Sequence, residues 1–257
     1  MNRFQSSSAF HEDTTCQAQQ GQRGEATSEY TAAAKHSLFV PLHYEKNYAY
    51  PLLVWLHGAN DNERQLRRVM PSISLRNYVA VAPRGTSDDL SGAEGSYCWR
   101  QEDADIIEAQ GRLTDAIQRV QSRYHIHDER IFIGGYADGG SMALRLALRM
   151  PHLFAGVISI AGTLPDNLAP LVNLERARGM NVLLLQGQSS CDYTTAQLCG
   201  DLRVLHAAGM SVAIRQYPAG DELTTKMLAD VDSWVMERVT GLSSEPSHAL
   251  CDHRERN

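Results

Sequence analysis

The chain has 257 residues, of which 43% are hydrophobic and 21% charged, and its formal net charge is −6. The mean hydropathy is −0.34, and no apolar stretch approaches the roughly 20 residues that a bilayer span requires, which excludes a transmembrane protein. The acidic balance argues against broad binding to nucleic acid or anionic membranes, because both need clustered lysine and arginine. Composition therefore indicates a soluble globular protein with a large core.

The cysteines and the N-terminal segment indicate where in the cell the protein is found and whether it binds a metal. Five cysteines, at positions 16, 98, 191, 199 and 251, have irregular spacings that fit neither a disulfide framework nor a zinc site. The first residues contain no apolar core of the kind that a signal peptide needs. We therefore expect a cytoplasmic protein with no metal and no other cofactor.

Both ends of the chain differ in composition from its middle. Residues 1–34 are rich in Gln, Ser, Thr, Glu and Gly and have almost no aliphatic side chains, which predicts a disordered or loosely attached polar arm. Residues 242–257 are similarly polar and charged, and we expect a polar tail there. Residues 35–241 contain no repeat and no linker, so we expect one domain.

Short apolar runs alternate with longer helical patterns through this domain. An edge strand is expected at 38–42, and further strands are expected at 52–56, 79–82, 131–133, 157–160, 182–185 and 212–214. Apolar residues three or four positions apart predict helices at 62–69, 103–124, 140–149, 195–208 and 223–239. This alternation indicates an α/β fold with a mostly parallel central sheet and helices on both faces. In such a sheet the ligand site lies beyond the C-terminal ends of the strands.

One segment has the pattern of a nucleophile elbow. The strand at 131–133 is followed by Gly-Gly-Tyr-Ala-Asp-Gly-Gly at 134–140. Glycines two residues on either side of Ala137 allow the tight strand-to-helix turn that presents a nucleophile. An alanine methyl group cannot attack a carbonyl carbon, so we expect an elbow without its nucleophile.

Residues 134–143 resemble the Gly-x-Ser-x-Gly-Gly-x-Met-Ala string of the α/β-hydrolase family, in its carboxylesterase, phospholipase and polyhydroxybutyrate-depolymerase-like branch. The resemblance extends over roughly residues 38–240. It implies the α/β-hydrolase fold and a descent from carboxylic ester hydrolases. It also implies that backbone N–H groups at Gly58, Ala59 and Asp138 form an oxyanion hole.

The resemblance also implies places for the catalytic acid and histidine. The family's His-Gly-x-x-Asp string reads Gln-Gly-Gln-Ser-Ser at 186–190, which puts Ser190 at the acid position with Asp192 displaced by two. The family's Tyr-Pro-x-x-Gly-His-like turn puts Asp221 at the histidine position. Ala137, Ser190 and Asp221 thus form a degenerate triad. Loss of a nucleophile or its histidine costs on the order of a million-fold in turnover, so we expect no serine esterase activity.

Other side chains near this site have both catalytic and structural interpretations. His57 is a base without a nucleophile to activate, and we expect its ring to bond to neighbouring backbone and hold the oxyanion loop. Asp138 is expected to stabilise a helix N-terminus rather than act as an off-centre nucleophile. Ser141 is expected to bond to a backbone carbonyl. His57, Tyr136 and Trp99 are candidate pocket residues, and Trp99 could equally cap the core.

The carboxylates of Asp138, Asp192, Asp221 and Glu222 follow strands at one edge of the sheet. They form either a cation site or a solvated acidic surface, and we favour the surface. The leading hypothesis is a pseudo-hydrolase that binds a small ester-like or acyl ligand or a protein partner. The alternatives are an active hydrolase with a site rebuilt from Asp138 or Asp192 and His57, with or without a metal, and a non-catalytic partner subunit.

Overall fold

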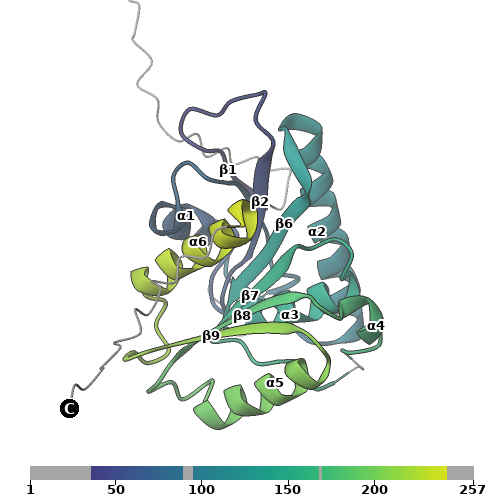
Figure 1. Cartoon of the computed structure of the whole chain (residues 1–257), viewed down its shortest axis with the longest axis vertical. Helices are drawn as coiled ribbons and strands as arrows, with labels where there is room; N and C mark the ends of the chain where they lie inside the picture. The colour runs from purple at the N-terminus through teal and green to yellow at the C-terminus, as the bar shows by residue number, and fades with distance from the viewer. Residues whose placement is uncertain (1–35, 89–94, 168–169, 242–257) are drawn as a thin grey trace, which may run out of the picture.

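The computed structural model describes residues 36–88, 95–167 and 170–241. The polar arm expected at 1–34 and the tail expected at 242–257 lie outside the described residues. The described segments fold together around a central sheet flanked by helices (Figure 1).

In the described part of the chain, seven strands form the central sheet in the order β1-β3-β2-β6-β7-β8-β9. Neighbouring strands are parallel except β1, which pairs antiparallel with β3 at the edge. The predictions of a mostly parallel sheet and an early edge strand are confirmed. The strands are β1 (His36–Phe39), β2 (Tyr50–Leu56), β3 (Val79–Pro83), β6 (Ile126–Tyr136), β7 (Gly156–Ile160), β8 (Asn181–Gly187) and β9 (Ser211–Tyr217).

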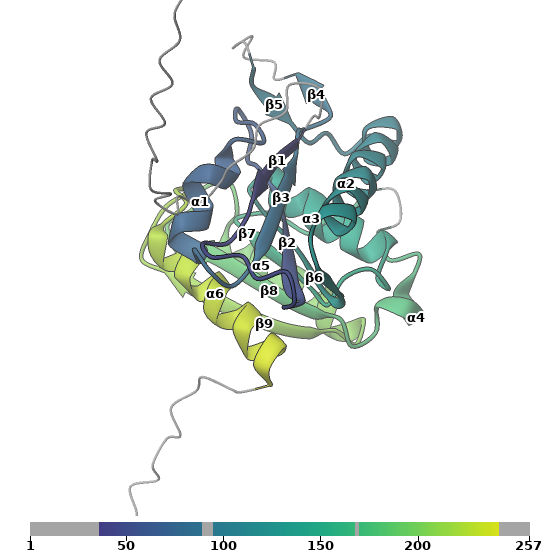
Figure 2. The same ribbon diagram turned by 90° about the horizontal axis from the view of Figure 1, so that it is seen from above.

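Helices cover both faces of the sheet, as predicted (Figure 2). On one face lie α1 (Gln65–Ile73) and α6 (Thr225–Thr240), and on the other lie α2 (Asp103–Arg123), α3 (Asp138–Arg149) and α5 (Thr195–Ala207). Alternate side chains of each strand enter opposite cores. In β2, Val54 packs toward α2 and α3 while Trp55 packs toward α1 and α6. Among the described residues, no helix combines the length and apolarity needed to cross a membrane.

Local contacts explain where α5 begins and where α6 begins and ends. Thr194 precedes α5, and its side chain and that of Gln197 bond to each other's backbone N–H in a capping box. Thr224 caps α6 by accepting the N–H of Met227 at 3.3 Å. Gly241 ends α6 with a left-handed φ of 70°.

Two short features have no counterpart in the sequence predictions. A small sheet joins β4 (Ser87–Asp88) to β5 (Tyr97–Cys98), and a single helical turn forms α4 (Leu174–Ala177). Each of these elements covers only about one period of a hydrophobic pattern, so no repeating pattern could reveal them. β5 leads directly into Trp99, which belongs to the site described next.

Candidate functional site

The sharp turn from β6 into α3 is centred on Ala137. Its φ of 52° and ψ of −122° are strained for a residue that carries a Cβ. The Ala137 N–H donates to the carbonyl of Ile160, at the end of β7, at 2.8 Å. Its own carbonyl accepts the N–H of Ser141 at 3.1 Å and so starts α3. Ala137 thus lies at the C-terminal edge of the sheet, where the site was expected.

Close backbone contacts require the glycines on either side of Ala137. A Cβ built on Gly135 would lie 2.4 Å from the carbonyl oxygen of Gly139. A Cβ on Gly139 would lie 2.3 Å from the carbonyl oxygen of His57, in the loop after β2. These separations are too short for any side chain, so only glycine permits the turn and the approach of the His57 loop. The backbone of the turn therefore has the form of an elbow although its central side chain is a methyl group.

Ser190 and Asp221 meet across the loops that follow β8 and β9. The Ser190 hydroxyl donates a hydrogen bond to the Asp221 carboxylate. The same carboxylate accepts the N–H groups of Cys191 at 3.2 Å and Asp192 at 3.3 Å. The bond from Ser190, followed by these N–H groups, holds the pKa of Asp221 below its ordinary value. Asp192 therefore takes part through its backbone, and Asp221 is an ionised acceptor.

Tyr136 connects the elbow to the Asp221 loop. Its hydroxyl donates a hydrogen bond to the carbonyl oxygen of Asp221, and its ring lies against Gly58, where an added Cβ would come within 2.7 Å of the ring. Burial, together with the charges of Asp221, Asp192 and Glu222, raises the pKa of Tyr136. The phenol is therefore a neutral donor that braces the loops on both sides of Ala137.

His57 is fully buried, and both of its ring nitrogens face backbone groups. Nδ1 lies 2.8 Å from the carbonyl oxygen of Gly58, and Nε2 accepts the N–H of Gly85 at 2.9 Å. Because a carbonyl only accepts and an amide N–H only donates, the proton must sit on Nδ1. Burial lowers the pKa of His57, so the ring is neutral. His57 is thus engaged by backbone on both sides, as its structural interpretation predicts, and it is not among the residues that line the cavity described below.

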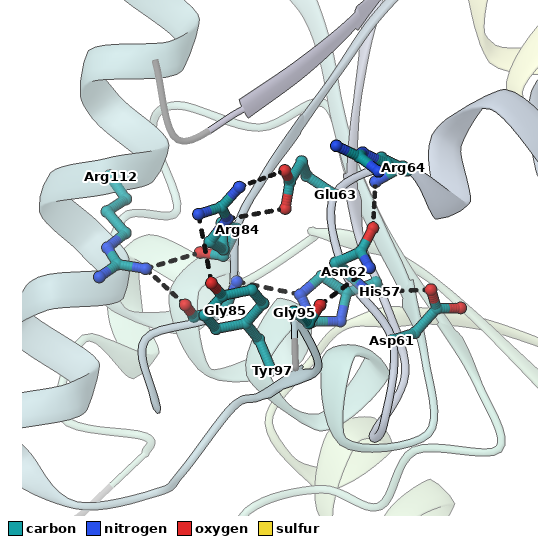
Figure 3. A network of polar contacts seen from close by, with 10 residues as sticks. All are labelled: His57, Asp61, Asn62, Glu63, Arg64, Arg84, Gly85, Gly95, Tyr97 and Arg112. Atoms are coloured by element: carbon teal, nitrogen blue, oxygen red, sulfur yellow. Dashed lines mark hydrogen bonds and ion pairs between the residues drawn. The ribbon is translucent and has the colours of Figure 1, made fainter. Parts of the chain in front are cut away.

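A polar network fastens the same loop to the segment after β3 (Figure 3). Arg84 makes two hydrogen bonds to the Glu63 carboxylate, at 2.7 and 2.9 Å, and Glu63 is only 1% exposed. Arg84 also donates to the Tyr97 hydroxyl at 3.2 Å, and Arg112 donates to the carbonyl of Gly85. Burial opposes ionisation of Glu63, but its bonds with Arg84 outweigh burial and lower its pKa. A paired buried charge thus fixes the loop after β2.

The Asp138 carboxylate faces a cavity beside the elbow. It accepts the N–H groups of Trp99 and Gly139, each at 3.0 Å. Burial raises the pKa of Asp138 to about 6, against the opposing effect of the N–H groups around it. The cavity has a volume of about 460 Å³, and its walls are Trp99, Gln101, Asp138, Ser141, Thr163, Leu164, Pro165, Asp166, Asn167, Gln197, Gly200 and Asp201.

Two further candidate residues line this cavity. Trp99 is 2% exposed and its indole N–H donates to the carbonyl of His57 at 2.9 Å, so it is at once a wall of the cavity and a core side chain. The Ser141 hydroxyl lies 3.5 Å from that of Thr163, across the cavity wall. The expected bond from Ser141 to a backbone carbonyl is therefore wrong, because its hydroxyl faces that of Thr163 instead.

The four carboxylates near the site divide into two places. Asp138 faces Trp99, whereas Asp192, Asp221 and Glu222 surround Tyr136. Across the ranges 36–88, 95–167 and 170–241, no three His, Cys, Asp or Glu side chains are grouped so that they could hold a metal ion. Of the two interpretations of these carboxylates, the cation site therefore finds no support among the described residues, and Asp138 bonds to the Trp99 segment rather than to the Asp221 loop.

Two residues that fix the loop after β2, Glu63 and Arg84, were not among the candidate site residues. They are 21 positions apart and meet only because β2 and β3 are neighbours in the sheet. A single sequence does not show whether a glutamate is buried or exposed. The hydrophobic pattern therefore could not show that this ion pair is buried and holds the site.

Comparison with known proteins places this geometry in a family. Residues 43–235 match the phospholipase/carboxylesterase family. Lysophospholipase-like protein 1 of Mus musculus is 28% identical over 210 residues, which are 74% of this chain and 87% of that protein. Carboxylesterase SOBER1 of Arabidopsis thaliana is 22% identical over 211 residues, covering 75% of this chain and 92% of that protein. A shorter match to NocK of Nocardia uniformis, at 29% identity over 120 residues, spans 45% of this chain and about a third of that protein, 34%.

Solved structures share the fold at low sequence identity. A carboxylesterase from Mesorhizobium loti has a TM-score of 0.67 at 18% identity, covering 81% of this chain and 98% of that one. The Bacillus cereus carboxylesterase has a TM-score of 0.63 at 20% identity, covering 80% of this chain and 95% of that one. The central sheet, the elbow and the family match over most of the chain agree with one another, and this chain belongs to the phospholipase/carboxylesterase family of α/β-hydrolases.

Proposed function

We propose that the chain is a pseudo-hydrolase, which forms no acyl-enzyme and binds a small ester-like or acyl ligand in the cavity beside Ala137. The observation that carries this proposal is the methyl group of Ala137 at the centre of a strained elbow. The hydrogen-bonded pair of Ser190 and Asp221 supports it, since these residues stand where the family resemblance implies an acid and a histidine.

The chemistry of these side chains opposes acyl transfer. A methyl group has no lone pair with which to attack a carbonyl carbon. In a Ser-His-Asp triad a carboxylate orients an imidazole, which takes the proton of the nucleophile. Here the carboxylate of Asp221 accepts a hydrogen bond from Ser190. The three triad positions hold Ala137, Ser190 and Asp221, so none of them supplies an imidazole. His57 offers no replacement base, because backbone groups occupy both of its ring nitrogens.

The cavity supports a retained binding role. Its volume of about 460 Å³ lies within the range of about 300–1,000 Å³ that is usual for small-molecule sites. Trp99 supplies an aromatic wall, and Ser141 and Thr163 supply hydroxyl groups. Such a mixture suits a ligand with both an apolar part and polar oxygen atoms.

A panel of p-nitrophenyl esters of increasing acyl length tests the proposal. The native chain is expected to release p-nitrophenol no faster than heat-denatured protein. The triple variant Ala137→Ser, Ser190→Asp and Asp221→His is assayed beside it, and any gain of turnover there shows that the cavity accepts an ester. Saturable hydrolysis by the native chain that disappears on denaturation would overturn the proposal. The assay is repeated with added divalent cation and with EDTA. Hydrolysis that needs the cation and stops in EDTA would indicate a metal-assisted site.

A further inference from the structure

We propose that a cavity between β1 and the second half of α2, the β1–α2 cavity, binds a phosphate group that carries a small aromatic or apolar substituent. Its volume is about 290 Å³, and its described wall consists of His36, Leu38, Arg119, Val120, Ser122, Arg123 and Tyr124. This volume is close to the lower limit of about 300 Å³ for small-molecule sites. None of these wall residues lines the cavity beside Ala137, so the inference does not depend on the proposed function.

Apolar side chains from two elements form part of the β1–α2 cavity. Leu38 of β1 and Val120 of α2 belong to the same hydrophobic core and are 5% and 2% exposed. Tyr124, which follows α2, adds an aromatic ring to the wall. This ring packs edge-on against that of Tyr44, with 5.3 Å between the ring centres. A small apolar or aromatic substituent therefore has fixed apolar side chains to pack against.

The charges of the wall favour an anion. Arg119 and Arg123 are four positions apart in α2, so both lie on the same face of the helix. No described wall residue of the β1–α2 cavity is acidic. The cavity beside the elbow has the opposite character, because its described wall has no basic residue and contains the carboxylates of Asp138, Asp166 and Asp201. In a chain with a net charge of −6, the β1–α2 cavity is thus a local exception that attracts negative charge.

The guanidinium of Arg119 has a partner with which an anion can compete. Its Nε donates to the carboxylate of Asp115, one turn earlier in α2, at 2.8 Å. Both side chains are 58% exposed, and an exposed ion pair of this kind holds its members only weakly. A phosphate offers an arginine two parallel hydrogen bonds between charged groups. It would also offset the repulsion between Arg119 and Arg123, since like charges at this spacing destabilise a helix.

His36 adds a donor from the opposite side, in β1. Burial, followed by the charge of Arg119, lowers the pKa of His36 against the opposing charges of Asp115 and Glu63. At about pH 7.5 the ring is therefore neutral, and one of its nitrogens carries an N–H that can donate to a phosphate oxygen. The strand thus contributes an imidazole and the helix contributes guanidinium groups to the same wall.

Phenyl phosphate is a suitable probe, because at about pH 7.5 it combines a mostly dianionic phosphate with an aromatic ring. We would titrate it into the full chain and follow the ring C–H signals of His36 by NMR. Inorganic phosphate, which lacks the ring, and benzyl alcohol, which lacks the charge, are titrated in parallel. The variant Arg119→Gln is compared with the control Arg67→Gln, which removes the same charge from an exposed position in α1, on the other face of the sheet.

We expect saturable binding of phenyl phosphate by the native chain and binding about tenfold weaker in Arg119→Gln, because a hydrogen bond between charged groups is worth about one power of ten in affinity. The Arg67→Gln control should bind as the native chain does, and both partial probes should bind more weakly than phenyl phosphate. The inference would be overturned by the absence of saturable binding, by unchanged binding in Arg119→Gln or by an equal loss in the control. It would also be overturned if inorganic phosphate or benzyl alcohol bound as tightly as phenyl phosphate.

Discussion

The hydroxyl of Ser190 donates a hydrogen bond to the carboxylate of Asp221, and this bond joins the loops after β8 and β9. The family resemblance implies an acid in the first loop and a histidine in the second. In this chain the acidic group lies in the second loop and its donor in the first, so the contact between the loops exists with the negative charge on the opposite side.

Removing the Ser190 hydroxyl should raise the pKa of Asp221. The bond from Ser190 is the largest of the contacts that lower this pKa, so Ser190→Ala should move it back toward the ordinary value of an aspartate. A pH titration of the side-chain carboxyl carbon by NMR measures the change. The control is Ser189→Ala, because Ser189 is the adjacent serine and its side chain is exposed. An unaltered Asp221 titration in Ser190→Ala would show that the bond has no effect in solution.

Asp138 should make the stability of the protein depend on pH. Its pKa is raised from 3.8 to about 6 in the folded state, so between about pH 4 and pH 6 the folded protein binds more protons than the unfolded chain. The free energy of unfolding therefore falls as the pH rises through this window. Two pKa units correspond to about 3 kcal/mol.

Asp138→Asn removes this titration and provides the measurement. Relative to the native chain, the variant should gain about 3 kcal/mol of stability between pH 4 and pH 7, as measured by urea denaturation at a series of pH values. At any single pH, the difference in free energy of unfolding between the two proteins also includes other effects of the amide. The informative quantity is therefore how this difference changes with pH. A constant offset from pH 4 to pH 7 would contradict the raised pKa.

Glu63→Gln should destabilise the fold strongly. It leaves the Arg84 guanidinium without its charged partner in a place where the carboxylate is 1% exposed, and breaking such a pair costs about 3 kcal/mol. Asp115→Asn is the control, because its ion pair with Arg119 is solvent-exposed and should change nothing measurable. Equal effects of the two substitutions would mean that the Arg84–Glu63 pair does not anchor the loop after β2.

Ala137→Gly should stabilise the protein. The φ of 52° at Ala137 strains a residue with a Cβ, and glycine relieves this strain, for a net gain of about 1 kcal/mol after its own entropic cost. Ala207→Gly, at the last residue of α5, should instead lose stability, since glycine is a poor helix former. Calorimetry of both variants tests the difference, and a loss at position 137 equal to that at 207 would argue against strain in the elbow.

The strands and helices could be predicted from the sequence where one pattern dominates. The helix expected at 103–124 is observed at Asp103–Arg123, because apolar residues recur at helical spacing along its whole length. β6 begins at Ile126, five residues before the apolar run that predicts it, since the intervening polar side chains are exposed or half-buried and break the pattern. α1 was predicted at 62–69 but spans Gln65–Ile73, because Met70 and Ile73 are buried around Pro71 and packing extends the helix past the proline.

The candidate site could be predicted in its location but not in its contacts. The meeting of the loops that hold Ser190 and Asp221 follows from the parallel neighbours β8 and β9, whose C-terminal ends lie side by side. The bond from Trp99 to Asp138 joins residues 39 positions apart, and no periodicity encodes it. Backbone donors such as the Trp99 N–H are identical in every sequence, so only the folded chain reveals which carboxylate they bind.

The most direct test of the account is the intact mass of the native protein after incubation with a fluorophosphonate, which reacts with an activated serine. We expect an unchanged mass, equal to that of a sample denatured before the same treatment, because Ala137 offers no nucleophile and the ring nitrogens of His57 are both engaged by backbone groups. An added phosphonyl group on the native protein, absent from the denatured sample, would contradict the claim that this member of the phospholipase/carboxylesterase family is a pseudo-hydrolase.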